Sequence, residues 1–182
     1  QKKVQKFYRV VRSEEFVSGN KYLSVEPSDR FEVDYEIDFG PDLVQRYHFT
    51  LSEASYESEI SRAKTFCFES DIHKMRAMGL ARGGSLANAL VMGRNSLLNP
   101  DQQTYADEFV RHKILDFLGD SRLLDRPVVG RFVVRRGGHA FHTECLRSLW
   151  EKGSLALSVP KPLSTSADQA QVSGKNLLPL GQ

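Results

Sequence analysis

A nine-residue run of strict alternation constrains the fold more than any other feature of this sequence. From Phe31 to Phe39, apolar side chains occupy every odd position and acidic side chains occupy every even position. Successive side chains of a strand point to opposite faces, so the run predicts a β-strand with one buried and one solvated face. Gly40-Pro41 ends this strand, and residues 45–51 are its predicted hairpin partner.

The remaining periodicities predict a mixed order of elements. Further strands are expected at Phe7–Val11, Tyr22–Glu26, Leu86–Met92 and Val128–Arg135. Helices are expected at residues 52–63, 72–80, 105–118 and 139–152, with Gly79 and Gly119 closing the second and third. Strands come first and are then interleaved with helices. This order predicts an α+β two-layer sandwich, in which a mainly antiparallel or mixed sheet carries helices on one face.

Length and composition bound the class of protein. A chain of 182 residues has room for one ordinary domain, predicted at residues 1–153, and a tail at 154–182 rich in Ser, Pro, Gln and Gly. A hydrophobic fraction of 40% and a charged fraction of 26% exclude a disordered, fibrous or membrane-embedded chain. A net charge of +2 gives no support to nucleic-acid binding. Two cysteines favour a reducing compartment.

The densest cluster of chemically active side chains lies in the predicted helix at residues 105–118. His112 and Asp116 are four residues apart and share one helix face, a spacing that suits one divalent ion, typically zinc. Asp120, one turn further on, is predicted to hold a histidine or a cation, and Lys113 is predicted on a different face. The alternative is a charged helix face with a His–Asp hydrogen bond, which the spacing alone favours.

Two smaller clusters offer further candidates. His139 follows Gly137-Gly138 at the start of a predicted helix, where it suits a proton donor or an electrostatic stabiliser, or is simply a capping histidine. His142, one turn later, is predicted to lie on the surface. Thr65 stands beside two aromatic residues and either places a hydroxyl in a pocket or belongs to a short core strand.

A glycine-rich segment lies between these clusters. Gly83-Gly84-Ser85 lacks the spacing and the lysine of a nucleotide-binding loop, so it is predicted to form a tight turn. Small and apolar residues flank it, as a slot for an acyl chain would require and as a core would equally require. They are Leu80, Ala81, Leu86, Ala89 and Val91.

Taken in order, these clusters resemble one family. The segments are Ala63–Phe66, Gly79–Ala89, Asp107–Asp120 and Gly138–Ala140, and the resemblance covers roughly residues 7–152. Together they are similar to the UDP-3-O-acyl-N-acetylglucosamine deacetylases of lipid A biosynthesis. The most specific segment is the Glu-Phe-Val-Arg-His-Lys run that begins at Glu108 and continues to Gly119-Asp120.

The resemblance implies a zinc amidohydrolase acting on an acylated UDP-glucosamine. The family folds as two similar α+β domains with the active site between them, and this chain resembles the second. His112 and Asp116 match two of three Zn²⁺ ligands, and His139 matches the general-acid histidine. Asp120 matches the carboxylate partner of that histidine, and Thr65 matches the hydroxyl that helps to hold the oxyanion.

The resemblance also implies where the substrate lies. Phe66 and Lys113 match positions that contact substrate, and residues 69–91 match an insert that forms a passage for the acyl chain. The lining positions predicted for that passage are Leu80, Ala81, Gly84, Ser85, Leu86, Ala89 and Val91. Lys64, Ala87, Ser121 and Gly137 depart from the pattern of many members, and none of these is a predicted metal ligand.

One part of the family pattern is missing from the sequence. The first domain of the family carries a Glu-His pair, which supplies the general base and the third Zn²⁺ ligand, and no Glu-His dipeptide occurs here. We therefore expect a separate N-terminal deacetylase domain as partner, and an enzyme that is inactive without it. The chain begins at Gln1, in keeping with that expectation. The alternative is a non-catalytic structural or assembly subunit. The expected compartment is the bacterial cytoplasm, or an organelle matrix after removal of a leader.

Overall fold

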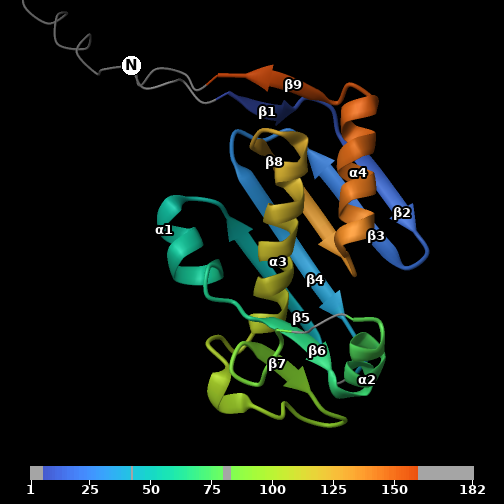
Figure 1. Cartoon of the computed structure of the whole chain (residues 1–182). Helices are drawn as coiled ribbons and strands as arrows, with labels where there is room; N and C mark the ends of the chain where they lie inside the picture. The colour runs from blue at the N-terminus through green and yellow to red at the C-terminus, as the bar shows by residue number, and fades with distance from the viewer. Residues whose placement is uncertain (1–5, 42, 80–82, 160–182) are drawn as a thin grey trace, which may run out of the picture.

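β8 (Val128–Arg135) is the central strand of the main sheet in the computed structural model, which describes residues 6–41, 43–79 and 83–159 (Figure 1). It pairs antiparallel with β3 (Lys21–Glu26) and parallel with β4 (Phe31–Asp38) and β1 (Phe7–Val10). Three outer strands complete the sheet: β2 (Glu14–Ser18) beside β3, β5 (Val44–Thr50) beside β4, and β9 (Leu155–Ser158) beside β1. The predicted α+β architecture with a mixed sheet is confirmed.

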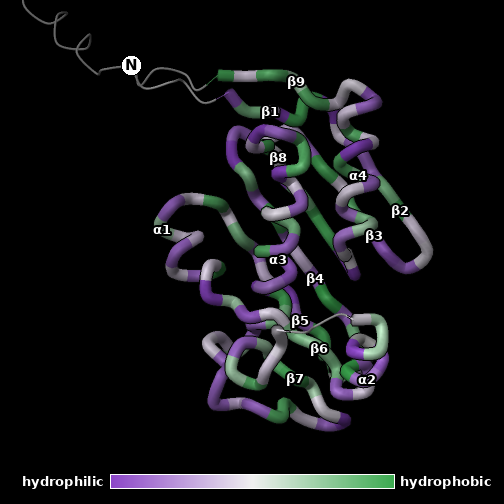
Figure 2. Tube along the Cα trace, in the orientation of Figure 1, coloured by the Kyte–Doolittle hydropathy of each residue, from purple (hydrophilic) through white to green (hydrophobic). Residues whose placement is uncertain are grey.

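The alternation in β4 gives the main sheet its two faces. Its odd positions, among them Tyr35, are buried and its even positions are partly exposed, as predicted. On the outer face, the Arg46 guanidinium of β5 donates to both carboxylate oxygens of Asp34, at 2.7 and 2.8 Å. This pair lowers the pKa of Asp34. Figure 2 shows apolar and polar segments alternating along these strands.

Two long helices cover one face of the sheet. α3 (Glu108–Ser121) and α4 (His139–Glu151) lie side by side in front of the strands in Figure 1. Phe117 of α3 is at the centre of the core, with ring centroids 5.2 Å from Phe132 and 6.0 Å from Phe31. Burying such an aromatic ring between the sheet and the helices contributes on the order of 2–3 kcal/mol to the stability of the fold. This packing fixes which faces of α3 and α4 meet.

A smaller unit projects from the end of the main sheet. β6 (Thr65–Phe68) and β7 (Ala89–Met92) pair in parallel, with α2 (Glu69–Ala77) between them in the chain. Gly79 follows α2 with a φ of +74°, a conformation that favours glycine and ends a helix, as predicted. A 3₁₀ turn at Pro100–Gln102 leads from this unit toward α3.

Four predicted boundaries are wrong. The helix expected at 72–80 is α2, which begins at Glu69 and ends at Ala77. The helix at residues 52–63 is only α1 (Glu53–Ser55), followed by a π-helix at Tyr56–Ile60. The strand at Leu86–Met92 is reduced to β7, because residues 86–88 form turns whose backbone is held by side chains. The helix at 105–118 begins at Glu108 and runs through Gly119 to Ser121, with a 3₁₀ turn at Arg122–Leu124. Asp120 therefore lies on the helix, not beyond it.

Two strands were not expected. β2 forms a hairpin with β3 around Gly19-Asn20, where Gly19 has a φ of +59°. A Gly-Asn pair between two short β-like runs is a recognised hairpin signal, so the sequence did carry this information. β9 falls in the segment predicted as a tail, and it pairs with β1 from Phe7↔Ser158 to Val10↔Leu155. The rest of that segment, residues 160–182, lies outside the described residues.

Candidate active site

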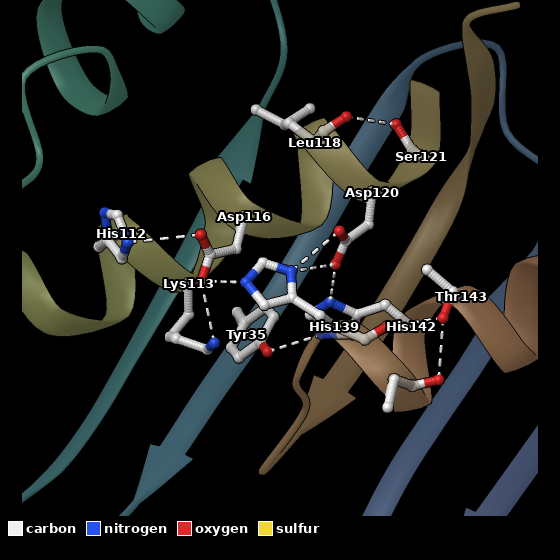
Figure 3. Close-up of polar contacts among 11 residues, drawn as sticks. Tyr35, His112, Lys113, Asp116, Leu118, Asp120, Ser121, His139, His142 and Thr143 are labelled. Atoms are coloured by element: carbon white, nitrogen blue, oxygen red, sulfur yellow. Dashed lines mark hydrogen bonds and ion pairs between the residues drawn. The ribbon is translucent and has the colours of Figure 1, made fainter. Parts of the chain in front are cut away.

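α3 places three of the predicted residues on one face. His112, Asp116 and Asp120 follow one another at intervals of four residues, and Figure 3 shows their side chains along the same side of the helix. His112 Nε2 lies 3.3 Å from Asp116 Oδ1. The unbroken passage of the helix through Gly119 brings Asp120 into this row. The structure therefore unites residues that the sequence pattern had placed partly on a loop.

The geometry of His112 suits a metal ligand. Its Nδ1 lies 3.1 Å from the carbonyl oxygen of Ala63, which can only accept, so Nδ1 donates. In the neutral ring Nε2 then turns a lone pair toward Asp116, and two acceptors need a cation or a proton between them. Two donor atoms on one tetrahedral zinc ion, at about 2.0–2.1 Å each, lie about 3.3–3.4 Å apart. The spacing of this pair fits that group.

Lys113 fixes the orientation of the Asp116 carboxylate. Its Nζ lies 3.0 Å from Asp116 Oδ2, so the prediction that Lys113 occupies a different face is wrong. The lysine side chain is long enough to reach back across the three residues that separate the two Cα atoms. Because Oδ2 is bound by Lys113, Oδ1 is the oxygen that faces His112. Among the described residues, no group of three or more His, Cys, Asp and Glu side chains is arranged to hold a metal ion.

α4 begins at His139 and brings two further histidines, His139 and His142, to the site. His139 Nδ1 lies 2.9 Å from Asp120 Oδ1 and 3.0 Å from Oδ2, so it donates to that carboxylate. Its Nε2 is turned toward Asp116, 3.7 Å from Oδ2. The His139 side chain is 66% exposed, whereas Asp120 is 12% exposed. An exposed ring held by a mostly buried carboxylate has one nitrogen free to exchange protons with a ligand.

His142 is fully buried, so the prediction that it lies on the surface is wrong. Its Nδ1 lies 2.8 Å from Asp120 Oδ2, and its Nε2 lies 2.9 Å from the hydroxyl of Tyr35 (Figure 3). Burial lowers the pKa of His142 to about 4, although the hydrogen bond with Asp120 acts in the opposite direction. Burial raises the pKa of Tyr35, with the charge of Asp116 as the next cause. Asp120 therefore receives hydrogen bonds from two histidines.

β6 brings Thr65 and Phe66 to the N-terminal half of α3. The Phe66 ring lies 4.6 Å from that of Phe109 and 6.2 Å from the imidazole of His112. Thr65 is exposed at the start of the strand. Glu108 holds β6 against the start of α3: its fully buried carboxylate accepts a hydrogen bond from the Lys64 amide at 2.8 Å. No role was predicted for this side chain from the sequence. The same carboxylate accepts from two amides in the turn before α3.

The insert encloses a cavity of about 730 Å³. Its walls include predicted passage residues at five positions and the two residues at the start of β6, namely Gly84, Ser85, Leu86, Ala89, Val91, Thr65 and Phe66. Leu80 and Ala81, which were predicted to line the same passage, lie outside the described residues. Apolar linings of this size are typical of small-molecule sites.

Asn99 holds the loop of this cavity in place. It is buried, and its side-chain amide accepts from the Val91 amide at 3.0 Å and donates to the carbonyl oxygens of Leu86 and Ala89 at 2.7 and 2.8 Å. Both amide hydrogens of Asn99 and its carbonyl oxygen are thus bonded to the backbone that forms the cavity wall. No sequence motif marks Asn99 for this role.

Comparison with known proteins identifies the family of this chain. A family model described as UDP-3-O-acyl N-acetylglycosamine deacetylase matches residues 1–151. The chain belongs to this family. The family resemblance inferred from the motifs is thus confirmed, and the match includes α3, the insert and all of α4.

Several relatives carry the name UDP-3-O-acyl-N-acetylglucosamine deacetylase. The protein of Anaeromyxobacter dehalogenans is 45% identical over 137 residues, which are 74% of this chain and 44% of the relative. That of Myxococcus xanthus is 43% identical over 146 residues, 79% of this chain and 46% of the relative. That of Helicobacter hepaticus is 42% identical over 132 residues, 71% and 44% respectively. The chain thus spans less than half the length of these relatives.

No described helix is both long and apolar enough to cross a bilayer.

Proposed function

We propose that this chain supplies one wall of a zinc-dependent deacetylase site that acts on UDP-3-O-acyl-N-acetylglucosamine, a step of lipid A biosynthesis in the bacterial cytoplasm. The observation that carries the proposal is the pair of His112 Nε2 and Asp116 Oδ1, 3.3 Å apart on one helix face. His112 Nδ1 is bonded to the Ala63 carbonyl and Asp116 Oδ2 to Lys113, so Nε2 and Oδ1 are the atoms that face each other. Family membership gives that geometry its chemical context.

His112 and Asp116 would hold Zn²⁺ in this proposal. When bound there, the ion would act as a Lewis acid on the amide carbonyl and lower the pKa of water. Ala63 and Lys113 prepare the two ligands: the carbonyl fixes the histidine tautomer, and the ammonium group fixes the carboxylate rotamer. Such supporting partners typically account for 10- to 100-fold of metal affinity or activity.

His139 would donate a proton to the leaving group, or a hydrogen bond to the developing oxyanion, through Nε2. Its Nδ1 is committed to Asp120, so Nε2 is the nitrogen available to a substrate. The Asp120 carboxylate accepts from Nδ1 and so fixes the tautomer and orientation of the ring. Thr65, exposed on β6 next to Phe66, would add a hydroxyl donor to the same oxygen.

The cavity of the insert would take the acyl chain. Residues of β6, β7 and α2 line it, and Thr65 and Phe66 are among them. Leu86, Ala89 and Val91 give it apolar walls that match a hydrocarbon chain, and Glu69, His73 and Arg76 of α2 add charged or polar groups to the lining. The substrate would therefore lie with its acyl chain in the insert and its amide beside α3.

The remaining groups of the site would come from a partner segment with a Glu-His pair. The sequence contains no such dipeptide, and the described residues hold no three-group metal cluster. A missing general base lowers the rate by roughly 10²- to 10⁴-fold. We therefore expect negligible acetate release by the 182-residue chain alone, and restoration when the uncovered part of the Anaeromyxobacter dehalogenans relative is added in trans.

A zinc-binding comparison tests the assignment of the ligands. Elemental analysis after dialysis would measure zinc in the assembled protein for the wild type, Asp116→Asn, and Asp107→Asn as matched control. Asp107 is the N-cap residue of the same helix and pairs with Arg111 instead. We expect Asp116→Asn to lose zinc and acetate release together while Asp107→Asn keeps both. Full zinc content in Asp116→Asn would remove the ligand assignment. Zinc binding without turnover in the assembled wild type would favour a non-catalytic subunit.

A further inference from the structure

Asp120 is shared by two histidines, of which the proposed chemistry uses only one. His139 Nδ1 donates to it from the exposed side, at 2.9 Å from Oδ1. His142 Nδ1 meets Oδ2 from the buried side, at 2.8 Å. His142 has no exposed surface and therefore cannot touch a substrate. Its contribution has to pass through Asp120.

The hydrogen bonds around His142 have a single consistent assignment. The Asp120 carboxylate only accepts, so Nδ1 of His142 carries the hydrogen. Because burial keeps the His142 ring neutral, with a pKa of about 4, Nε2 holds a lone pair. The Tyr35 hydroxyl, 2.9 Å away, then donates to Nε2. Tyr35 thereby selects the tautomer that places a donor against Asp120.

Packing holds the His142 ring in this orientation. Phe117 lies edge-on to the ring, with centroids 4.9 Å apart, and Tyr35 approaches at 5.8 Å. Gly137 lies against the polar end, where a Cβ atom would come 2.5 Å from the Tyr35 hydroxyl and would also overlap His142 Nε2. The glycine before Gly138-His139 is therefore required by the contact between Tyr35 and His142. The ring has no room to tilt away from Asp120.

We propose that His142 is a positioning residue, which fixes the Asp120 carboxylate by donating Nδ1–H to Oδ2 and so holds His139 in place from behind. The inference rests on the proposed function only for the role given to His139. Without the buried donor, the carboxylate is free to rotate about its Cβ–Cγ bond, and both of its contacts with His139 Nδ1 change together.

The first test reads the tautomer directly. Long-range ¹H–¹⁵N NMR on the ¹⁵N-histidine-labelled 182-residue chain at pH 7 distinguishes Nδ1–H, Nε2–H and doubly protonated rings. We expect His142 as a single neutral Nδ1–H tautomer, and we expect Tyr35→Phe to mix in the Nε2–H form. The matched control is Tyr47→Phe, which removes the hydroxyl of a different tyrosine, directly across from Tyr35 in the sheet, whose hydrogen bond goes to Glu59 and not to a histidine. An Nε2–H or doubly protonated His142 in the wild type would overturn the proposal.

The second test separates positioning from packing. Asparagine at 142 places an amide nitrogen near the position of Nδ1, whereas glutamine places it near Nε2. We expect His142→Gln to shift the His139 Nδ1 resonance of the chain. In the enzyme assembled with the partner domain, we expect it to lower kcat for acetate release by roughly 10- to 100-fold, with KM changed less than about twofold. His142→Asn should keep the His139 resonance and recover most of kcat. Thermal unfolding would confirm that both variants fold.

The outcomes are distinguishable from those of the proposed function. Equal loss in the Asn and Gln variants, or no change of the His139 resonance in either, would mean that His142 only fills space, and would overturn the inference. If the assembled wild type releases no acetate, the proposed function fails, while the His139 resonance in the two variants still decides the inference.

Discussion

Acid is expected to destabilise this protein well above the pH at which its carboxylates titrate, because His142 is buried as a neutral ring. The side chain has no exposed surface, and burial lowers its pKa to about 4 from an ordinary value of 6.5. The hydrogen bond with Asp120 opposes this shift and does not overcome it. Unfolding releases the ring to water, where it takes up a proton more readily.

The sign and size of the effect follow from that difference. Between pH 6.5 and 4 the unfolded chain binds more protons at this residue than the folded chain does, so the free energy of unfolding rises with pH across this window. A difference of 2.5 pKa values corresponds to about 3.4 kcal/mol when fully expressed. Relative to pH 7, the folded state loses about 2 kcal/mol at pH 5 and about 3 kcal/mol at pH 4.

Urea unfolding of the 182-residue chain at pH 7, 6, 5 and 4 measures this loss. The wild type is compared with His142→Asn, which cannot titrate and retains an amide donor for Asp120. Glu14, Asp34 and Asp38 have lowered pKa values, and they add a loss of stability at acid pH in both proteins alike. The difference between the two proteins isolates the histidine.

The expected difference changes by about 2 kcal/mol between pH 7 and pH 5, in favour of the variant at the lower pH. A difference that stays constant over this range would refute the reasoning. It would mean that folding does not lower the pKa of His142.

Three further predictions concern packing and the cavity. Gly137→Ala should lower the free energy of unfolding by about 1–3 kcal/mol, because its Cβ would overlap the Tyr35 hydroxyl. Gly138→Ala, whose Cβ meets nothing within 4 Å, should cost only about 0.5–1 kcal/mol, the cost of alanine at the N-cap of α4. Equal effects in thermal unfolding would contradict this. Glu108→Gln should cost about 1.5–3 kcal/mol in urea unfolding, because a buried charged acceptor of backbone amides is lost, and an unchanged midpoint would show that the charge is not needed. Ala89→Phe should reduce acetate release from long acyl substrates more than from short ones, since the side chain would fill the cavity, and a uniform loss for all chain lengths would indicate core packing.

The sequence by itself determined the elements whose pattern is local. The alternation of Phe31–Phe39 decided which face of β4 is buried, since every second side chain of a strand points the same way. The interval between His112 and Asp116 decided that their side chains meet, because a helix returns to the same face after four residues. The motifs along α3 and the start of α4 were enough to indicate the family.

Only the tertiary structure decided the rest. β9 forms because β1 presents the free hydrogen-bonding edge with which it pairs. The periodicity of a four-residue strand cannot reveal such a partner. Gly119 continues α3 where glycine usually ends a helix, because the flanking turns are packed on the sheet and override local propensity. Tyr35 and His142 are 107 residues apart, and their contact depends on how α4 is packed against β4. A histidine on a short polar segment looks exposed in the sequence. His142 is buried here because α4 packs it against Tyr35 of β4, and because Gly137 has no side chain to occupy the same space.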